Sequence, residues 1–324
     1  MKKNQIKKIA VMTSGGDSPG MNSVIQAIVA TGLKQKLNIY IVRDGYLGLY
    51  NNQIEIIDYI DEFSRFINNS GTFLGTSRFL PFQNDFEIRK ICAQNLKKLD
   101  IDTLIIIGGD GSYRGAIKLE ELGIKCIGIP ATIDNDIQKT DFTIGFSTSV
   151  NNVLDAIEKL RDTSLSHNRC TIIEVMGRQK GDLALYGGIA AGVDLIVTRE
   201  NYIEKQIILD KIKTLKQQNK RHAIVVITEN IFNVNELAKE VEKYSGFETR
   251  AQILGHIQRG GTPTVEDRVL ASHMGNYAIK LLKENIHNCG ISIKKQKITH
   301  FSFEDIFNSI EKRNELFDII KELY

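Results

Sequence analysis

The chain has 324 residues, which at roughly 150 residues per domain indicates about two domains. Its 42 Lys and Arg nearly balance its 39 Asp and Glu, giving a net charge of +3 that excludes the strongly basic domain of a typical nucleic-acid binder. Apolar residues make up 42% and charged residues 25%, which excludes wholesale disorder.

Cysteine usage and hydrophobicity do not indicate a secreted or membrane protein. The four cysteines are widely spaced, without a C-x-x-C pair or a histidine spaced as a zinc co-ligand, which disfavours disulfides and thiolate metal sites. The apolar run within MKKNQIKKIAVMTSGGDSPG is too short for a signal peptide, and no run approaches 18 apolar residues. We therefore expect a soluble cytoplasmic protein that binds neither nucleic acid nor membrane.

Short apolar runs alternate along the chain with longer segments of helical periodicity. Continuous apolar runs of this kind predict strands buried on both faces, and their alternation with helices predicts parallel sheets covered by helices. In chain order, the expected strands cover 9–13, 103–109, 126–130, 171–177 and 223–228, and the helices after them cover about 23–36, 114–122, 150–161, 183–191 and 234–244. The predicted fold class is α/β.

Glycine, carboxylate and cationic residues follow each expected strand. These segments are 14–17, 108–112, 131–136, 176–178 and Glu229, and a sixth segment, 256–261, follows the short run AQILG at 251–255. In open α/β sheets, ligands bind outside the carboxyl ends of the strands, whereas unrelated surface loops would scatter such residues over both ends. The sequence therefore predicts a ligand site at the carboxyl ends.

Two of these segments, 14–17 and 108–112, are glycine-rich turns that lead into helices. Glycine allows close backbone approach, and the helix N-terminus behind it favours phosphate. One such turn alone could equally be a tight turn without a ligand. Neither turn contains a Walker A or a G-x-G-x-x-G motif, so neither a P-loop nor a dinucleotide fingerprint is indicated.

Three carboxylates in these segments are candidates for metal binding or proton transfer. Asp110 lies within the second glycine turn, where it could hold Mg²⁺ between itself and phosphate oxygens, or could simply cap the helix. Asp134 and Asp136 lie two residues apart, so that they could hold a metal, or one could act as general base while the other positions it. An Asx-rich turn is the alternative.

Five arginines lie in short polar segments of the type that recognises phosphate in a bidentate manner. They are Arg78, Arg169, Arg178, Arg250 and Arg259. Each alone is more commonly solvated or ion-paired, and His256 alone is more commonly structural. Together with two phosphate-type turns and a metal carboxylate, they predict phosphoryl transfer between two phosphorylated ligands.

The motifs of this chain resemble those of the bacterial ATP-dependent 6-phosphofructokinase family, in the same order and over nearly the whole chain. They are TSGGDSPGMN, GYLGLY, GTFLGTSR, GGDGS, ATIDND, RDTSLSH, VMGR, GDLAL, ITE and LGHIQRGG. The resemblance implies two similar Rossmann-like α/β domains with mainly parallel sheets, the active site in the cleft between them, and a homotetramer. It assigns 1–144 plus about 257–307 to ATP, and 145–256 plus about 308–324 to the sugar phosphate.

The implied reaction is phosphoryl transfer from Mg-ATP to the 1-hydroxyl of D-fructose 6-phosphate, the committed step of glycolysis. By resemblance, ATP would contact Gly16, Arg78, Phe79, Gly109, Asp110, Gly111 and Ser112, with Asp110 serving Mg²⁺. Fructose 6-phosphate would contact Thr132, Asp134, Met176, Gly177, Arg178, Glu229, His256 and Arg259, with Arg169 and Arg250 supplied by a neighbouring subunit. Catalysis would rest on Asp134 as the base, with Arg178 and Thr132.

Two positions bear on the phosphoryl donor. Ala131 stands where ATP-dependent relatives usually have Gly and pyrophosphate-dependent relatives usually have Lys, and Gly111 is retained where the latter have Asp. Both positions favour ATP, and a pyrophosphate-dependent enzyme is the alternative. NAD or lipid kinases share the GGDG turn but lack HIQRGG and MGR, and a non-catalytic phosphosugar-binding regulator would be marked by loss of Asp110 or Asp134.

The family's second phosphate site, for the effectors ADP and phosphoenolpyruvate, is incomplete in this chain. Two of its arginines correspond to Gln26 and Ala30, and a third falls near Tyr59 or Ile60. The residues that remain are Arg161, Asp194, Lys220, Arg221 and His222. We therefore expect weak or altered effector control.

Overall fold

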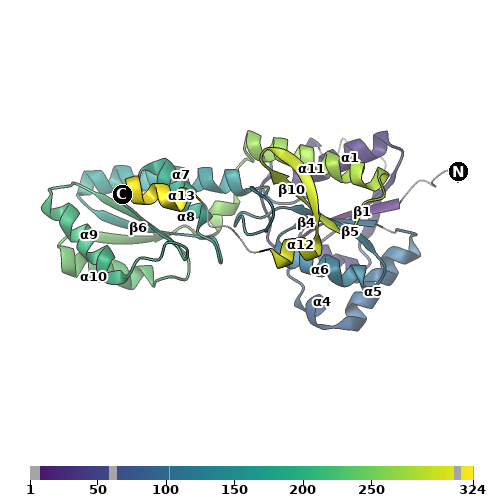
Figure 1. Cartoon of the computed structure of the whole chain (residues 1–324), viewed down its shortest axis with the longest axis horizontal. Coiled ribbons are helices and arrows are strands. Elements are labelled where there is room, and N and C mark those ends of the chain that lie inside the picture. Colours follow the sequence, from purple (N-terminus) through teal and green to yellow (C-terminus); the bar gives the residue numbers. More distant parts are fainter. Residues whose placement is uncertain (1–7, 58–63, 102, 310–314, 324) are drawn as a thin grey trace. The chain divides into compact units, whose positions relative to one another are not determined.

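The computed structural model describes residues 8–57, 64–101, 103–309 and 315–323 (Figure 1). The chain divides into two compact units. Unit 1 comprises Met1–Thr148 and Gly261–Glu311, and unit 2 comprises Ser149–Gly260 and Lys312–Tyr324. No helix among the described residues is long and apolar enough to cross a membrane.

Unit 1 is built on a seven-stranded sheet in the order β11-β10-β5-β4-β1-β2-β3. Its strands are β1 (Lys8–Ser14), β2 (Asn38–Val42), β3 (Ile54–Ile57), β4 (Thr103–Gly108), β5 (Lys125–Pro130), β10 (Cys289–Lys294) and β11 (Lys297–Ser302). The five inner strands run parallel, and the edge strands β3 and β11 each pair antiparallel with their neighbour. The inner strands β4 and β1 are almost completely buried, as their continuous apolar runs predict.

Helices cover both faces of this sheet (Figure 1). They are α1 (Met21–Lys34), α2 (Gly45–Tyr50), α4 (Leu80–Asn84), α5 (Phe86–Lys98), α6 (Asp110–Glu120), α11 (Val265–Lys283) and α12 (Phe303–Asn308). Alternate residues of β1 enter different cores: Ile9 and Val11 pack with α1 and α11, whereas Ala10 and Met12 pack with α5 and α6. This alternation follows from the period of two along a strand.

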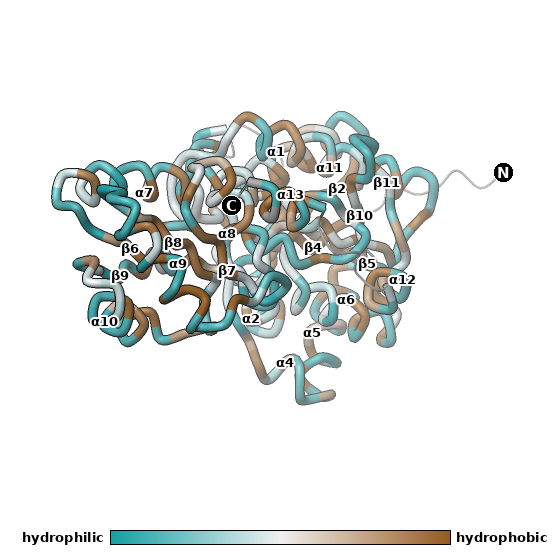
Figure 2. Tube along the Cα trace, turned by 60° about the vertical axis from the view of Figure 1, so that its left-hand side comes forward, coloured by the Kyte–Doolittle hydropathy of each residue, from teal (hydrophilic) through white to brown (hydrophobic). Residues whose placement is uncertain are grey.

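Unit 2 contains a four-stranded, wholly parallel sheet in the order β7-β8-β6-β9. Its elements are β6 (Cys170–Val175), β7 (Leu195–Val197), β8 (Ala223–Thr228), β9 (Thr249–Ile253), α8 (Asp182–Ala191), α9 (Lys205–Gln217), α10 (Val234–Ser245), the 3₁₀ helix η1 (Gly255–Arg259) and α13 (Leu316–Leu323). The long helix α7 (Phe146–His167) begins three residues before the unit boundary. Figure 2 shows β6 and β8 as largely hydrophobic segments between more polar helices.

The α/β class with mainly parallel sheets is confirmed. One predicted boundary is wrong in an informative way: the helix expected from about 114 begins at Asp110. Glycine is a poor helix former, so the GGDG run predicts a turn, yet its last two residues already belong to the first turn of α6.

Candidate active site

Three of the predicted segments meet at the carboxyl edge of the unit 1 sheet. Strands β1, β4 and β5 are neighbours, and their register pairs Ser14 with Gly108 and Gly108 with Pro130. The segments after these strands therefore begin at the same level of the sheet. The prediction that these segments gather at the carboxyl ends holds for this unit.

The GGDGS turn packs closely against the end of β1. A Cβ atom on Gly108 would lie 2.5 Å from the Ser14 carbonyl oxygen, so that position needs glycine. The Ser112 hydroxyl donates a hydrogen bond to the same oxygen at 2.9 Å, and the Tyr46 hydroxyl donates to the Ser112 carbonyl at 2.7 Å. Ser112 is buried and fastens the turn, whereas a Cβ on Gly111 would meet nothing within 4 Å.

Helix α6 begins at Asp110 without a side-chain cap, because its N-cap residue is Gly109. The first N–H groups of a helix have no intrahelical acceptors and carry a partial positive charge. Together with the open space at Gly111, this terminus suits a phosphate group.

The Asp110 carboxylate is paired with Arg114 one turn along α6. Arg114 donates to both carboxylate oxygens, at 2.9 and 3.2 Å, and its guanidinium lies 4.4 Å from the Phe307 ring centroid. The Asp110 side chain is 35% exposed, so one face remains accessible. Arg114 was not singled out in the sequence, although the i,i+4 spacing of opposite charges on a helix is the signal that could have found it.

The donor set fits a magnesium ion that is held mainly by phosphate and water. Among the described residues, no group of three or more His, Cys, Asp or Glu side chains could hold a metal. Mg²⁺ commonly takes one or two protein carboxylates and completes its shell with substrate phosphates and water. Asp110 supplies one such carboxylate beside a phosphate-type helix terminus.

The TIDND segment folds back on itself around Asn135. This residue has a left-handed backbone (φ 51°), and its side-chain oxygen accepts from the Thr143 N–H at 3.0 Å. The Thr143 hydroxyl in turn donates to the Thr132 carbonyl at 2.7 Å. Thr132 and Asp134 are both buried, with 8% and 3% exposure, and the Thr132 side-chain oxygen accepts from the Asp134 N–H at 3.2 Å.

The GGDGS turn and the TIDND segment adjoin each other. A Cβ on Gly109 would lie 3.6 Å from the Thr132 Cβ, in ordinary van der Waals contact. Unit 1 thus brings a phosphate-type helix terminus, with its carboxylate Asp110, next to the segment that carries Asp134. Ala131, between β5 and this segment, is fully buried.

The segment that leads to Arg78 and Phe79 is tied to the end of β1. The Thr13 hydroxyl donates to the Gly75 carbonyl at 2.7 Å, and the Thr76 hydroxyl donates to the Gly15 carbonyl at 2.8 Å. Arg78 is exposed and follows directly. These contacts place Arg78 and Phe79 after a segment fixed beside Gly15, and Gly16 is the next residue of the glycine turn.

Asn22 holds the loop at 66–73 in place, a role that was not predicted from the sequence. Its buried side-chain amide donates to the carbonyls of Phe66, Asn69 and Gly71 at 2.9–3.1 Å, and its oxygen accepts from the Phe73 N–H at 2.8 Å. These loop contacts depend on tertiary structure, so no local pattern predicts them.

In unit 2, a second group of predicted residues gathers at the carboxyl edge of the sheet. Strands β6 and β8 end side by side at Val175 and Thr228. The Arg178 N–H, after β6, donates to the Glu229 carboxylate, after β8, at 2.9 Å. His256 and Arg259 belong to η1, which follows the neighbouring strand β9.

The Met176-Gly177-Arg178 turn has an unusual backbone. Gly177 has φ 146° and Arg178 has φ 53°, a left-handed conformation that costs a non-glycine residue free energy. A Cβ on Gly177 would also lie 3.2 Å from the Thr228 methyl group. Arg199 donates to the Arg178 carbonyl at 3.2 Å, so contacts from outside the turn hold it in place.

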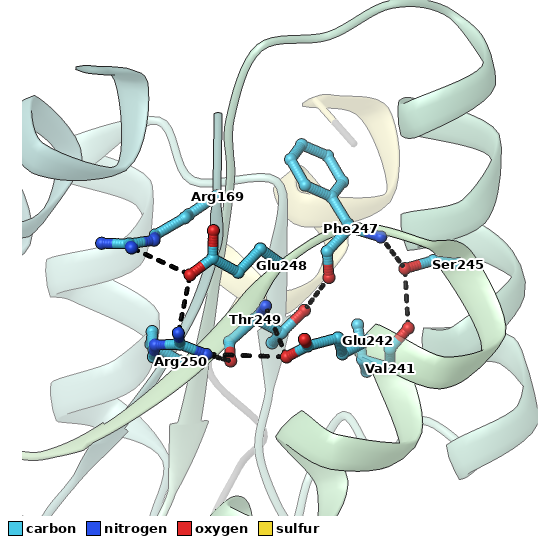
Figure 3. A network of polar contacts seen from close by, with 8 residues as sticks. All are labelled: Arg169, Val241, Glu242, Ser245, Phe247, Glu248, Thr249 and Arg250. Atoms are coloured by element: carbon cyan, nitrogen blue, oxygen red, sulfur yellow. Dashed lines mark hydrogen bonds and ion pairs between the residues drawn. The ribbon is translucent and has the colours of Figure 1, made fainter. Parts of the chain in front are cut away.

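Arg169 and Arg250 lie at the opposite edge of the same sheet (Figure 3). Arg169 precedes β6, and Arg250 is the second residue of β9, beside Thr171. Both guanidinium groups contact one oxygen of Glu248, at 2.8 and 2.6 Å, and Arg250 lies 3.6 Å from Glu242. The backbone of the six-residue strand β6 lies between Arg169 and the Arg178 turn, and it spans about 20 Å at 3.3 Å per residue.

The predicted effector residues also lie toward this amino edge. Asp194 accepts from the Ile224 N–H at 2.9 Å and pairs with Lys220, and Arg221 donates to Asn168, the neighbour of Arg169, at 3.2 Å. Burial lowers the pKa of His222. The charges of Lys220 and Arg161 lower this pKa further, whereas the Asp194 carboxylate acts to raise it.

The remaining positions of the expected effector site lie in unit 1. Gln26, on α1, donates to the Ser64 hydroxyl at 3.3 Å, and Ala30 lies on the same helix. Tyr59 and Ile60 fall outside the described residues.

Comparison with known proteins supports the interpretation of these motifs. Residues 8–282 match the family model described as "Phosphofructokinase". The chain is 49% identical over 321 residues to the ATP-dependent 6-phosphofructokinase of Vibrio campbellii, covering 98% of this chain and 100% of that one. It is 48% identical to the corresponding protein of Aliivibrio salmonicida, with the same coverage.

A solved structure agrees with this family. The phosphofructokinase from Saccharomyces cerevisiae superposes with a TM-score of 0.84 at 31% identity, covering 98% of this chain and 46% of that one. This chain therefore corresponds to about half of the yeast chain. With the motifs, the fold and the full-length relatives in agreement, the chain belongs to the phosphofructokinase family of enzymes.

Proposed function

We propose that this enzyme transfers the γ-phosphoryl group of Mg-ATP to the 1-hydroxyl of D-fructose 6-phosphate, giving fructose 1,6-bisphosphate and ADP in glycolysis. The proposal rests on one observation. The uncapped N-terminus of α6 and the TIDND segment lie next to each other at the carboxyl edge of the same sheet. Relatives that are 49% identical over their whole length carry this activity in their name. As a glycolytic enzyme, it would act in the cytoplasm.

On the ATP side, the phosphates bind at the start of α6, where Gly109 and Gly111 leave the backbone accessible. Arg78 and Phe79, with Gly16, hold the rest of the nucleotide. Asp110 holds Mg²⁺, which neutralises charge on the phosphates when it is bound. The ion pair with Arg114 orients the Asp110 carboxylate.

On the acceptor side, Asp134 takes the proton of the sugar 1-hydroxyl as the oxygen attacks the γ-phosphorus and the bond to the leaving ADP oxygen breaks. The Thr132 side chain fixes the backbone at Asp134 through its 3.2 Å hydrogen bond. Arg178 offsets charge on the transferring group. This division suits phosphoryl transfer, where positioning and charge neutralisation supply most of the catalysis.

The sugar phosphate is bound by residues from two copies of the chain. Met176, Gly177, Arg178, Glu229, His256 and Arg259 serve one site. Arg169 and Arg250 lie at the amino ends of the strands, whereas the Arg178 turn lies at the carboxyl ends. In a homotetramer, each chain would therefore supply Arg169 and Arg250 to the sugar-phosphate site of a neighbouring subunit.

ATP rather than pyrophosphate is the donor. Gly111 leaves open space at the α6 terminus, where an aspartate would bring a negative charge toward the nucleotide phosphates. Ala131 is small and buried, and a lysine there would need both room and a charge partner.

The test is a coupled assay that follows product release with ATP or pyrophosphate as donor, with and without fructose 6-phosphate and Mg²⁺. The proposal expects ADP release only when all three of ATP, sugar phosphate and metal are present. Turnover with pyrophosphate exceeding that with ATP, or ADP release without the sugar phosphate, would contradict it.

A further inference from the structure

The side chain of Gln258 connects η1 to the Arg178 turn in unit 2. Gln258 is completely buried. Its amide oxygen accepts from the Met176 N–H at 3.1 Å, and its amide nitrogen donates to the Gly255 carbonyl at 2.9 Å. One side chain thus joins two segments that carry predicted sugar-phosphate residues: Met176 to Arg178 on one side, and His256 and Arg259 on the other.

Both ends of the amide are needed in this position. The Met176 N–H requires an acceptor and the Gly255 carbonyl requires a donor, and only an amide offers both at the end of an uncharged two-carbon stem. A buried backbone group that loses its hydrogen-bond partner destabilises the fold, because nothing compensates for its removal from water. An apolar side chain of similar length would therefore fill the space and leave two buried polar groups unsatisfied.

The backbone of η1 is anchored independently of this amide. Asn152 on α7 donates to the carbonyls of Gln258 and Gly260, at 3.2 and 2.8 Å. Gln258 therefore extends from an anchored helix toward the turn, and the turn is the segment that depends on it. That turn contains the left-handed Arg178, whose conformation requires outside support.

We propose that Gln258 is a positioning residue for the sugar-phosphate site, acting through Met176 on the backbone that presents Arg178. The inference rests on the proposed role of Arg178. Glu229 holds the Arg178 N–H and Arg199 holds the Arg178 carbonyl, while Gln258 fixes the entrance of the turn. Loss of this hydrogen bond weakens sugar-phosphate binding and leaves the ATP residues of unit 1 untouched.

The experiment compares Gln258→Met with Gln258→Asn, and with the exposed Gln217→Met on α9 as a matched control. Gln258→Asn keeps the amide on a side chain that is one methylene shorter, so the amide no longer reaches the Met176 N–H. This variant changes the core less than Gln258→Met and serves as the test if Gln258→Met fails to fold. The readouts are KM for fructose 6-phosphate, KM for ATP, kcat and thermal unfolding.

We expect both Gln258 variants to raise KM for fructose 6-phosphate about tenfold or more, the effect of about 1.4 kcal/mol, with KM for ATP within twofold of the parent and no change in Gln217→Met. An unchanged KM for the sugar phosphate in a folded variant, or an equal rise in both KM values, would overturn the inference. Arg178→Ala is measured in parallel. If Arg178→Ala leaves KM for fructose 6-phosphate and kcat unchanged, the proposed site itself is wrong. If Arg178→Ala impairs these constants while the Gln258 variants do not, only the role of Gln258 is wrong.

Discussion

Asp134 is the residue on which the proposed chemistry depends most directly. Its carboxylate is buried in a segment folded around Asn135, so it can act as a base only toward a ligand brought to that segment. We predict that Asp134→Asn lowers kcat by about 10²–10⁴-fold, the usual range for a general base, with little change in thermal unfolding. A kcat within threefold of the parent would remove Asp134 from this role.

Asp136→Asn is the matched control, because Asp136 lies in the same segment and is only half-buried. The residue pattern alone left open which of the two carboxylates is the base, and the family resemblance assigned Asp134. We expect the Asp136 variant to retain most of the activity. A larger loss for Asp136 than for Asp134 would exchange their roles.

Asp110 gives a metal prediction. Replacing its carboxylate by an amide removes the one charged oxygen ligand that the α6 terminus offers to Mg²⁺. A hydrogen bond or contact to a charged group is worth about 1.5–3 kcal/mol, so Asp110→Asn is expected to raise the free Mg²⁺ needed for half-maximal activity about tenfold or more. Titration of Mg²⁺ at saturating substrates measures this, and an unchanged midpoint would show that Asp110 does not hold the metal.

At the residue scale, sequence reasoning found the residues that form motifs and missed those that support them. Asp110 lies within a glycine turn after a strand, which is a local and specific pattern. Asn22 and Gln258 lie within the motifs TSGGDSPGMN and LGHIQRGG, but their contacts could not be predicted, because each acts on a segment more than 40 residues away in the chain. Their roles depend on which loops the tertiary structure brings against them.

At the scale of elements, the start of α7 is capped from a distant helix. The buried carboxylate of Asp267, on α11, accepts from the N–H groups of Gly145 and Thr148 at 2.7 and 2.8 Å, and from the Thr148 hydroxyl. Burial raises the pKa of the Asp267 carboxyl, while these hydrogen bonds and one from Thr264 act in the opposite direction. Asp267 thereby fixes the end of the segment that begins with Thr132.

This geometry predicts a pH-dependent contribution to stability. Because the pKa of Asp267 is higher in the folded state, the folded protein binds the proton more tightly than the unfolded one. This group's contribution is then fully present below the unfolded pKa and is lost as the pH rises through the folded pKa. The side chain introduced in the Asp267→Asn variant does not titrate, so this pH-dependent loss occurs only in the parent. The free energy of unfolding of the variant minus that of the parent is therefore expected to rise between the unfolded and the folded pKa of Asp267, and to level off at higher pH.

Urea unfolding of the parent and Asp267→Asn between about pH 4 and 7 measures this difference. The exposed Asp318→Asn on α13 controls for a change of net charge. A pH-independent difference between Asp267→Asn and the parent, or one of the opposite sign, would contradict a raised pKa at Asp267.

Strands with continuous apolar runs could be predicted from sequence, whereas the inner strands β2 and β10 and the edge strands β3 and β11 were not predicted. Strands β1, β4, β5, β6 and β8 are buried on both faces and show continuous apolar runs. Strands β3 and β11 are half-exposed and pair antiparallel at the sheet edges, and their mixed composition resembles that of loops. No Pro- or Gly-rich segment marks the crossing between the units at 148, and at 260 the Gly260-Gly261 pair also belongs to the LGHIQRGG motif, so composition alone did not reveal the division.

At the scale of the whole molecule, effector control is expected to be weak. Gln26 and Ala30 provide no cation at two positions where the family resemblance implies arginine, and the loss of two contacts to phosphate would weaken binding by several powers of ten. An effector cannot shift the enzyme by more than its difference in affinity for the two states. Fructose 6-phosphate saturation curves with and without millimolar phosphoenolpyruvate should nearly coincide, whereas a large rightward shift that ADP reverses would show a working effector site.

The proposed sharing of active sites between subunits is suggested by the two ends of the unit 2 sheet. Arg169 and Arg250, held together by Glu248 (Figure 3), lie at the amino edge. The Arg178 turn lies at the carboxyl edge. One chain would then supply Asp134 and Arg178 to one site, and its arginine pair to another. Neither half of such a site functions alone.

Complementation between two inactive variants tests this central claim most directly. Asp134→Asn subunits and Arg169→Ala/Arg250→Ala subunits are each expected to be inactive, and are mixed, dissociated and reassembled into hybrids that are separated by a charge tag. The account predicts that hybrids regain part of the parent activity, because some sites combine an intact Asp134 from one chain with an intact arginine pair from another. Hybrids that assemble and remain as inactive as the two parent variants would contradict it.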